Sequence, residues 1–96
     1  IDEQVLDYAV RLARATRSWP GLAIGAGPRA SIALVRGARA RALLRGGAFV
    51  TPDDIKGCAL AVLRHRVRIA PELDIDGLEV DQVLKQLLDQ IPAPRQ

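Results

Sequence analysis

The stretch Val50-Thr51-Pro52-Asp53-Asp54 carries the clearest signal for the start of a helix in this chain. Thr51 is a good N-cap residue, because its hydroxyl oxygen can accept a hydrogen bond from a free N–H group of the first turn. Pro52 suits the first turn, where its missing N–H group costs nothing, and the two aspartates meet the positive end of the helix dipole. We therefore expect a helix that ends near His65 and buries Ile55, Ala59, Val62 and Leu63.

Before this point the sequence predicts two more helices. The first runs from about Glu3 to Thr16, with Asp2 as its N-cap and with Ile1 and Leu6 as a hydrophobic staple around that cap. A proline followed by a glycine then favours a turn. The residues at helical spacing on one face of this helix are Val5, Ala9, Leu12, Ala13 and Thr16.

The second helix is predicted to begin at Pro28 and to continue to Arg45, where Gly46 and Gly47 end it. Gly37 interrupts this helix at a cost of about 1 kcal/mol relative to alanine. The apolar side is expected to consist of Ile32, Leu34, Val35, Ala38, Ala42 and Leu43.

The last predicted helix, over residues 80–90, has the best apolar periodicity in the chain. Two prolines follow it, and we expect residues 92–96 to form a disordered tail. Residues 71–77 are expected to form a loop. The β-prone segments at residues 49–50 and 67–69 flank the third helix and could pair as a very short two-stranded ribbon.

The composition favours packed helices over a sheet sandwich. The chain has 96 residues, enough for one domain, and it contains only one Trp, one Tyr and one Phe, so its core must be built from Leu, Ile, Val and Ala. We predict an all-α fold, a small four-helix domain over residues 1–91 with at most a minimal two-stranded β-ribbon. Three or more paired strands would contradict this prediction.

Cysteine content and hydropathy restrict the class of protein further. Cys58 is the only cysteine, so the chain can form neither an internal disulfide nor a cysteine-based zinc site, which fits a reducing cytoplasm. No apolar stretch approaches the roughly 18 residues that a membrane span requires, and we expect no membrane contact. The sequence contains no methionine, and it is expected to be part of a longer protein.

The net charge of +3 conceals a strong asymmetry along the chain. No Asp or Glu occurs between Tyr8 and Pro52, while eight arginines fall within that segment. A positive middle third predicts a negatively charged partner such as phosphate, nucleic acid or an acidic neighbouring surface. A solvated, arginine-rich face is the other interpretation of the same pattern.

The segment Gly25-Ala26-Gly27-Pro28-Arg29-Ala30 formally matches the dinucleotide-binding pattern G-x-G-x-x-A. That interpretation fails, because the apolar segment before it is too short for a buried Rossmann strand. An acidic residue should also follow by about 20 positions to hold the ribose, and none occurs before Asp53. A dinucleotide site is therefore not expected here.

The same segment is better explained as an anion site at the start of a helix. Gly25 and Gly27 would let the backbone approach an anion, and the helix end contributes about half a positive charge. Arg29, predicted in the first turn, adds a full charge and a planar donor fork suited to phosphate oxygens, and Ser31 could donate a further hydrogen bond. An ordinary loop-to-helix transition with an exposed arginine is the alternative.

Other residues with chemical potential have structural explanations. His65 has no second histidine or cysteine at ligand spacing, so we interpret it as a helix-terminal residue stabilised by the dipole. Cys58 is expected to be a small buried hydrophobe, and Asp53 and Asp54 are explained by helix capping. No metal site is predicted. No Walker A pattern occurs, so the chain cannot bind and hydrolyse ATP unaided.

Four segments in the same order and spacing resemble the C-terminal lid of MoxR-type AAA+ ATPases, and the similarity extends from about Leu6 to Leu88. The family pattern is close to G-A-S-P-R-A, and its arginine is the residue known as sensor 2, which corresponds to Arg29. Gly27 stands where the family usually has serine, and Glu79 where a threonine cap is common. The four segments are Ala13-Arg14-Ala15-Thr16-Arg17, Gly25-Ala26-Gly27-Pro28-Arg29-Ala30-Ser31, Ala48-Phe49-Val50-Thr51-Pro52-Asp53-Asp54-Ile55 and Val62-Leu63-Arg64-His65-Arg66-Val67.

The resemblance implies a mechanical function in a larger protein. A core domain of the same chain would bind ATP and Mg²⁺, and the lid would place Arg29 near the γ-phosphate, with Gly25, Gly27 and Ser31 on the phosphate side. Homo-oligomeric rings, usually hexamers, are typical of the family. Chaperone-like remodelling or metal insertion, often with a partner containing a von Willebrand factor A domain, would be the outcome. The full-length protein would then be an ATP hydrolase, whereas this chain alone would bind no nucleotide tightly.

Two other classes of protein are consistent with the sequence. One is a small basic nucleic-acid-binding domain that contacts phosphates through Arg36, Arg39, Arg41 and Arg45, although no aromatic residues lie between these arginines for stacking. The other is a stand-alone adaptor whose amphipathic last helix docks on a partner. In the lid interpretation Arg36 belongs to the solvated face and serves as a control for Arg29.

Overall fold

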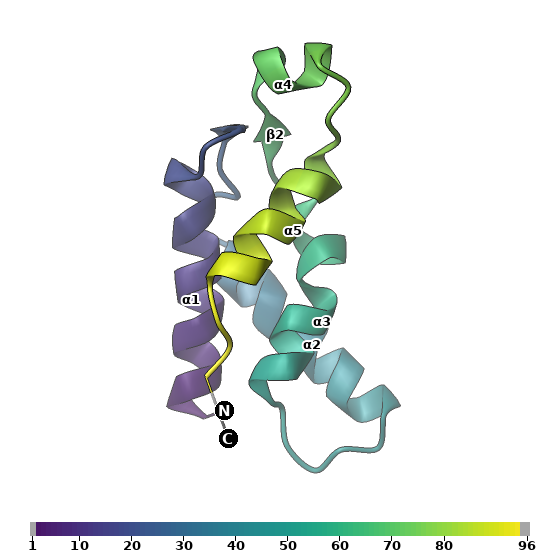
Figure 1. Cartoon of the computed structure of the whole chain (residues 1–96). Helices are drawn as coiled ribbons and strands as arrows, with labels where there is room; N and C mark the ends of the chain where they lie inside the picture. The colour runs from purple at the N-terminus through teal and green to yellow at the C-terminus, as the bar shows by residue number, and fades with distance from the viewer. Residues whose placement is uncertain (1, 95–96) are drawn as a thin grey trace.

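Five helices and two short strands make up the computed structural model, which describes residues 2–94. Figure 1 shows the α2–α3 loop at one end of the molecule and β2 with α4 at the other, with the long helices between them. The molecule measures 44 × 22 × 21 Å. The predicted all-α fold with a two-stranded ribbon is confirmed, and its elements are α1 (Glu3–Ser18), β1 (Leu22–Ile24), α2 (Ala30–Leu44), α3 (Pro52–Leu63), β2 (Arg68–Ile69), α4 (Pro71–Ile75) and α5 (Val80–Gln90).

The core lies where the four long helices meet, and aliphatic side chains dominate it as the composition predicts. Tyr8 of α1 is the exception, since its ring is fully buried and its hydroxyl donates to the carbonyl oxygen of Ile91 at 3.5 Å. Burying each large side chain stabilises the fold by roughly 1.5–3 kcal/mol relative to leaving it exposed. The largest fully buried apolar side chains are Tyr8, Leu12, Leu34, Ile55, Leu63, Leu84 and Leu87.

Helix α1 begins as predicted and continues to Ser18, two residues beyond the expected end. Asp2 is its N-cap, because Oδ1 accepts a hydrogen bond from the backbone N–H of Gln4 at 2.7 Å. The predicted apolar face, including Thr16, is buried. The proposed staple cannot be described, since Ile1 lies outside the described residues.

Helix α2 begins at Ala30, two residues after the predicted start at Pro28. Gly27 has a φ of +83°, a left-handed conformation that cannot belong to an α-helix, so the chain enters α2 through a turn over residues 27–30. Arg29 is therefore the N-cap residue and not part of the first turn. The predicted apolar side was wrong at Ile32 and Leu43, which are 53% and 80% exposed, because α2 packs on α1 and α3 through a narrower stripe.

Helices α2 and α3 form a hairpin that an ion pair closes. Arg45 donates from Nε and Nη2 to the two carboxylate oxygens of Asp54 at 2.9 and 2.7 Å, and Nη2 also donates to the Phe49 carbonyl at 2.7 Å. Thr51 is the N-cap of α3 as predicted, since its hydroxyl accepts from the Asp54 N–H at 3.3 Å while its own N–H donates to the Asp54 carboxylate at 2.8 Å. Gly37 explains the close approach of the two helices, because a Cβ there would lie 3.1 Å from Cys58 Sγ.

The ribbon exists, but its first strand was predicted wrongly. β1 pairs antiparallel with β2, with Leu22 opposite Ile69 and Ile24 opposite Arg68. Residues 49–50 instead lie in the α2–α3 loop, where the Arg45 side chain binds the Phe49 carbonyl. The predicted loop over residues 71–77 was also wrong, because Pro71–Ile75 forms the short helix α4.

Helix α5 has the predicted bounds and buries Val83, Leu84, Leu87 and Leu88. Glu79 is its N-cap residue, and the Glu79 N–H donates to the side-chain oxygen of Gln82 at 2.7 Å. Beyond the helix, Ala93 packs against the core, while residues 95–96 lie outside the described range, so the tail from residue 92 stays a prediction. No helix within residues 2–94 is long and apolar enough to cross a bilayer.

Candidate functional site

The segment between β1 and α2, residues 25–29, is fastened to the end of α1. The Thr16 hydroxyl is fully buried; it accepts a hydrogen bond from the Ala26 N–H at 2.9 Å and donates to the Ala13 carbonyl at 2.7 Å. A buried hydroxyl with both roles satisfied holds its partners in one arrangement. The loop that leads to Arg29 is therefore positioned by α1 and not only by its own turn.

The two glycines of this segment have different roles. A Cβ at Gly25 would lie 2.8 Å from the Cα of Arg17, so the absent side chain allows the loop to lie against the α1 backbone. This packing is a different reason for glycine from the approach of an anion that the sequence suggested. Gly27 has open space around its Cα, and its positive φ is what requires glycine.

Arg29 is exposed at the N-terminus of α2 and lines a depression of about 350 Å³. Arg36, two turns further along α2, lines the same depression, and so does Arg66 from the turn after α3. Ile32 and Ala33 complete the lining. Arg36 is exposed as expected, but it is not independent of Arg29, so it cannot serve as the neutral control that the sequence suggested.

Gly27 and Ser31 line a second depression, of about 200 Å³. Arg14 and Arg17 of α1 line it together with Pro28. Three of the four predicted site residues thus line depressions at the start of α2, with Arg29 in one and Gly27 and Ser31 in the other, whereas Gly25 lines neither and packs against α1. Sequence reasoning missed the arginines from α1 and from the turn after α3.

The charge around this loop is unbalanced. Ion pairs within residues 2–94 occupy other arginines, with Arg11 bound to Asp7, Arg45 bound to Asp54 and Arg64 bound to Asp81. None of the arginines that surround the loop forms such a pair within the same residues. Clustered positive charge with free N–H groups at a helix start is an arrangement that binds anions. The unpaired arginines are Arg14, Arg17, Arg29, Arg36 and Arg66.

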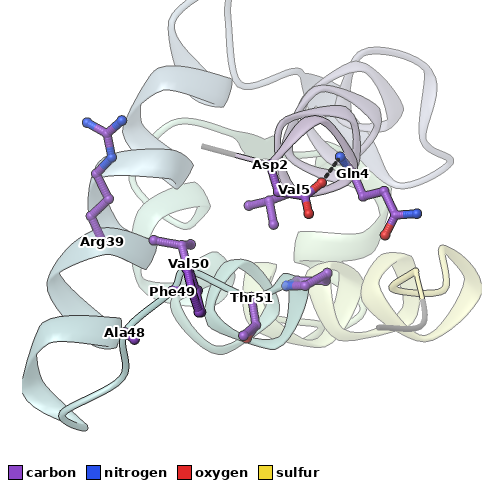
Figure 2. Close-up of a pocket in the computed structure, with 9 residues that line it drawn as sticks. Asp2, Gln4, Val5, Arg39, Ala48, Phe49, Val50 and Thr51 are labelled. Atoms are coloured by element: carbon purple, nitrogen blue, oxygen red, sulfur yellow. Dashed lines mark hydrogen bonds between the residues drawn. The ribbon is translucent and has the colours of Figure 1, made fainter.

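A further depression of about 640 Å³ lies between the start of α1 and the α2–α3 loop, as Figure 2 shows. Two of its polar side chains are already engaged, because Asp2 caps α1 and Thr51 caps α3. The Arg39 side chain extends away from Asp2 and Val5 in Figure 2. No set of free polar groups therefore converges on this space, and it offers less chemistry than the start of α2.

Cys58 and His65 are the other residues with chemical potential, and neither is placed as the sequence predicted: Cys58 is not fully buried and His65 lies two residues beyond the end of α3. Cys58 is half-buried, with Sγ 3.5 and 3.4 Å from the Leu34 and Ile55 carbonyls, and burial raises the pKa of its thiol, which disfavours the reactive thiolate. His65 is exposed in the turn after α3. No group of three His, Cys, Asp or Glu side chains within residues 2–94 lies close enough to hold a metal ion, and we assign no Mg²⁺ ligand to this domain.

The AAA lid domain family matches residues 14–87 of this chain. The chain is 34% identical over 95 residues to the uncharacterized protein YeaC of Bacillus subtilis, and the aligned region covers 99% of this chain and 30% of YeaC. It is 32% identical over 106 residues to the chaperone MoxR1 of Mycobacterium tuberculosis, and the aligned region covers 99% of this chain and 28% of MoxR1. The crystal structure of a proposed ATPase from Cytophaga hutchinsonii superposes with a TM-score of 0.87 at 29% identity, over 98% of this chain and 31% of that one.

The helical architecture and the sequence similarity agree. The chain belongs to the AAA lid domain family, and within it to the lids of MoxR-type AAA+ ATPases. It spans less than a third of the length of these relatives, 30% of YeaC and 28% of MoxR1.

Proposed function

We propose that this lid supplies Arg29 as the sensor 2 residue to ATP that a separate core domain of the same protein binds. The observation that supports the proposal is the position of Arg29, exposed at the N-terminus of α2 with no acidic partner among residues 2–94. Gly25 and Thr16 hold the loop that presents it, and Gly27 and Ser31 line a separate depression.

The chemistry of hydrolysis gives such an arginine a role. Charge spreads over the γ-phosphate oxygens in the transition state, and a fixed guanidinium stabilises that charge more than it stabilises the ground state. The helix N-terminus adds its partial positive charge at the same place. Arg29 would therefore both detect the γ-phosphate and lower the barrier to its release.

The remaining parts of the proposal, which concern the core domain, the assembly and the output, are based on the family resemblance. The core domain would hold Mg²⁺ with the triphosphate, the protein would assemble as a homo-oligomeric ring, and ATP turnover would change the angle between lid and core. Chaperone-like remodelling of client proteins is the output we propose, in line with the name of MoxR1. Metal insertion, and a partner with a von Willebrand factor A domain, are the variants of this proposal that the resemblance suggests.

The structure gives little support to nucleic-acid binding through the arginines of α2. Arg45 is committed to Asp54, and Arg41 Nε lies 3.9 Å from the same carboxylate. Arg36 lies in the depression of Arg29, and the remaining arginine of that predicted stripe, Arg39, lies beside a different depression. No continuous row of free arginines therefore runs along α2.

Substitution of Arg29 in the intact protein tests the proposal. Arg29→Ala should lower kcat for ATP hydrolysis by on the order of ten-fold to a thousand-fold, comparable with losing one charged donor in a transition-state site. Arg29→Lys should restore only part of the activity, because an ammonium group lacks the planar fork. Steady-state ATPase assays, with circular dichroism to confirm folding, measure both effects.

Arg11→Ala is the matched control. Arg11 is an exposed arginine of α1 that pairs with Asp7 and lines neither depression at the start of α2, so turnover should stay within about two-fold of the unsubstituted protein. Equal behaviour of the two variants would remove Arg29 from the sensor role. Mixing Arg29→Ala subunits with subunits that cannot bind ATP would show whether Arg29 serves its own subunit or a neighbour.

A further inference from the structure

Arg66 is the feature of the site that the lid function described above leaves unused. It lies in the turn after α3, two residues before β2, where its N–H donates to the Leu63 carbonyl at 2.9 Å. Its side chain lines the same depression as Arg29, although the two residues are 37 positions apart in the sequence, 66 against 29. The ribbon explains the proximity, because β2 begins two residues after Arg66 and pairs with β1, which leads into the Arg29 loop.

Three guanidinium groups that share one depression repel one another. Within residues 2–94 no carboxylate forms an ion pair with Arg29, Arg36 or Arg66 to relieve that repulsion. Solvent screens much of this energy while the depression is open. Closure against another domain would remove the solvent, and a polyanion would then be needed to balance the charge.

We propose that Arg66 is a second phosphate-binding residue, which contacts the same ATP polyphosphate as Arg29. The inference rests on the proposed lid function, because it takes ATP as the anion that enters this depression. Arg29 arrives from the helix start and Arg66 from the α3–β2 turn, so the two guanidinium groups approach the anion from different segments. Arg36, two turns further along α2, lines the same depression.

We expect Arg29 and Arg66 to contribute to different steps, hydrolysis and nucleotide binding. Arg29 responds to the charge that develops during hydrolysis, as argued above. Arg66 binds the polyphosphate in the ground state as well, and it therefore contributes mainly to affinity and to retention of the nucleotide under the lid. Arg66→Ala should consequently change nucleotide affinity more than kcat, whereas Arg29→Ala should change kcat more than affinity.

The test measures binding of a non-hydrolysable ATP analogue to the intact protein by titration calorimetry. Loss of one hydrogen-bonded charge contact should weaken the affinity of Arg66→Ala by about ten-fold to a hundred-fold. Arg66→Gln, which keeps a polar side chain but removes the charge, should weaken it by a similar amount, and Arg66→Lys should restore part of it. Thermal unfolding of each variant checks that the exposed side chain is not needed for folding.

Arg68→Ala is the matched control, because it removes the same charge two residues away. Arg68 is exposed on β2 and does not line the depression, so its loss should leave the affinity within about two-fold. If Arg66→Ala binds the analogue as tightly as Arg68→Ala does, the inference is overturned. Failure of the sensor role is a separate result, since it is measured by the kcat of Arg29→Ala and not by the affinity of Arg66→Ala.

Discussion

Asp54 is the residue whose environment differs most from what its place in the sequence suggests. Capping explains one of its carboxylate contacts, through the N–H of Thr51 at 2.8 Å. The side chain is also only 2% exposed and accepts two hydrogen bonds from Arg45. It thus joins the end of α2 to the start of α3, and we expect its loss to destabilise the hairpin.

The first prediction is that Asp54→Ala lowers the free energy of unfolding of the 96-residue chain by about 2–3 kcal/mol, from the lost cap and the lost charged hydrogen bonds. Asp53→Ala provides the control, because Asp53 is an exposed first-turn aspartate that acts mainly through the helix dipole. That change should cost about 0.5 kcal/mol. Urea denaturation at pH 7 measures both, and a similar loss from both variants would contradict the role of the Arg45 ion pair.

The pH dependence of stability gives a second prediction for Asp54. The hydrogen bond from Arg45 is the largest influence on this carboxyl and, against the opposing effect of burial, lowers its pKa from 3.8 to about 2. A carboxyl with a lowered pKa in the folded state stabilises the fold above its unfolded pKa, and that contribution disappears as the pH falls through the folded value. The difference in unfolding free energy between the unsubstituted chain and Asp54→Asn should therefore be constant above about pH 5 and shrink toward pH 2.

For single residues, the sequence predicts contacts between positions that are close together in the chain. Asp2 and Thr51 were identified as caps because capping joins residues only two or three positions apart. The Arg45–Asp54 pair and the Thr16–Ala26 hydrogen bond span nine and ten positions and depend on how the helices turn back on each other. Neither contact has a local sequence signal.

Helix packing depends on two glycines that should tolerate a methyl group very differently. A Cβ at Gly25 would lie 2.8 Å from the Arg17 Cα, a backbone atom of α1 that cannot move away. At Gly37 the nearest atoms belong to the side chains of Cys58 and Val62, at 3.1 and 3.3 Å. Side chains can shift by a few tenths of an ångström, whereas a helix backbone cannot do so without disturbing its own hydrogen bonds.

We therefore predict that Gly25→Ala destabilises the chain by about 1–3 kcal/mol through overpacking and displaces the loop that carries Arg29. Gly37→Ala should stay within about 1 kcal/mol of the unsubstituted chain, because the gain in helix propensity offsets the tighter contact. Thermal unfolding of the two variants compares them directly. A Gly25→Ala variant as stable as Gly37→Ala would show that the loop does not rest on α1 as described.

At the scale of elements, amphipathic periodicity was a good guide for α5 but not for all of α2, where Ile32 and Leu43 are exposed, and strand pairing was predicted wrongly. The spacing of apolar residues defined α5 from Val80 to Gln90 without error, since only one face of that helix is buried. The partner of β2 was missed because a strand of two or three residues has no periodicity, and its pairing is decided by where the helices bring it. Helix α4 had a usable signal, a proline at its first position followed by Glu72 and Asp74.

For the whole molecule, we predict that the 96-residue chain has no ATPase activity above background and binds nucleotide with millimolar affinity at best. One helix start and its arginines cannot enclose a triphosphate, and the chain lacks the phosphate-binding loop. Calorimetric titration with ATP and Mg²⁺ measures this, with the intact protein as the positive control. Tight, magnesium-dependent binding by the chain alone would contradict its role as a lid.

The order of motifs, more than any one of them, made the family recognisable from the sequence. The arginines around the loop could not be grouped in advance, because Arg14, Arg29 and Arg66 come from three segments that only the tertiary fold brings together. The sequence predicted an anion site at the start of the second helix, and the structure adds Arg14, Arg17, Arg36 and Arg66 to the surroundings of that candidate site.

The hydrogen bond between Tyr8 and Ile91 joins residues 83 positions apart and has a consequence for synthesis on the ribosome. The α2–α3 hairpin can form early, because the Arg45–Asp54 pair closes a loop of only nine positions. The buried face of α1 has no complete cover until α5 has been translated, since Leu84 and Leu87 belong to the same core. During translation the nascent lid therefore exposes the apolar face of α1 until its last helix, α5, covers it. A ribosome stalled before Val80 should leave a chain that chaperones bind.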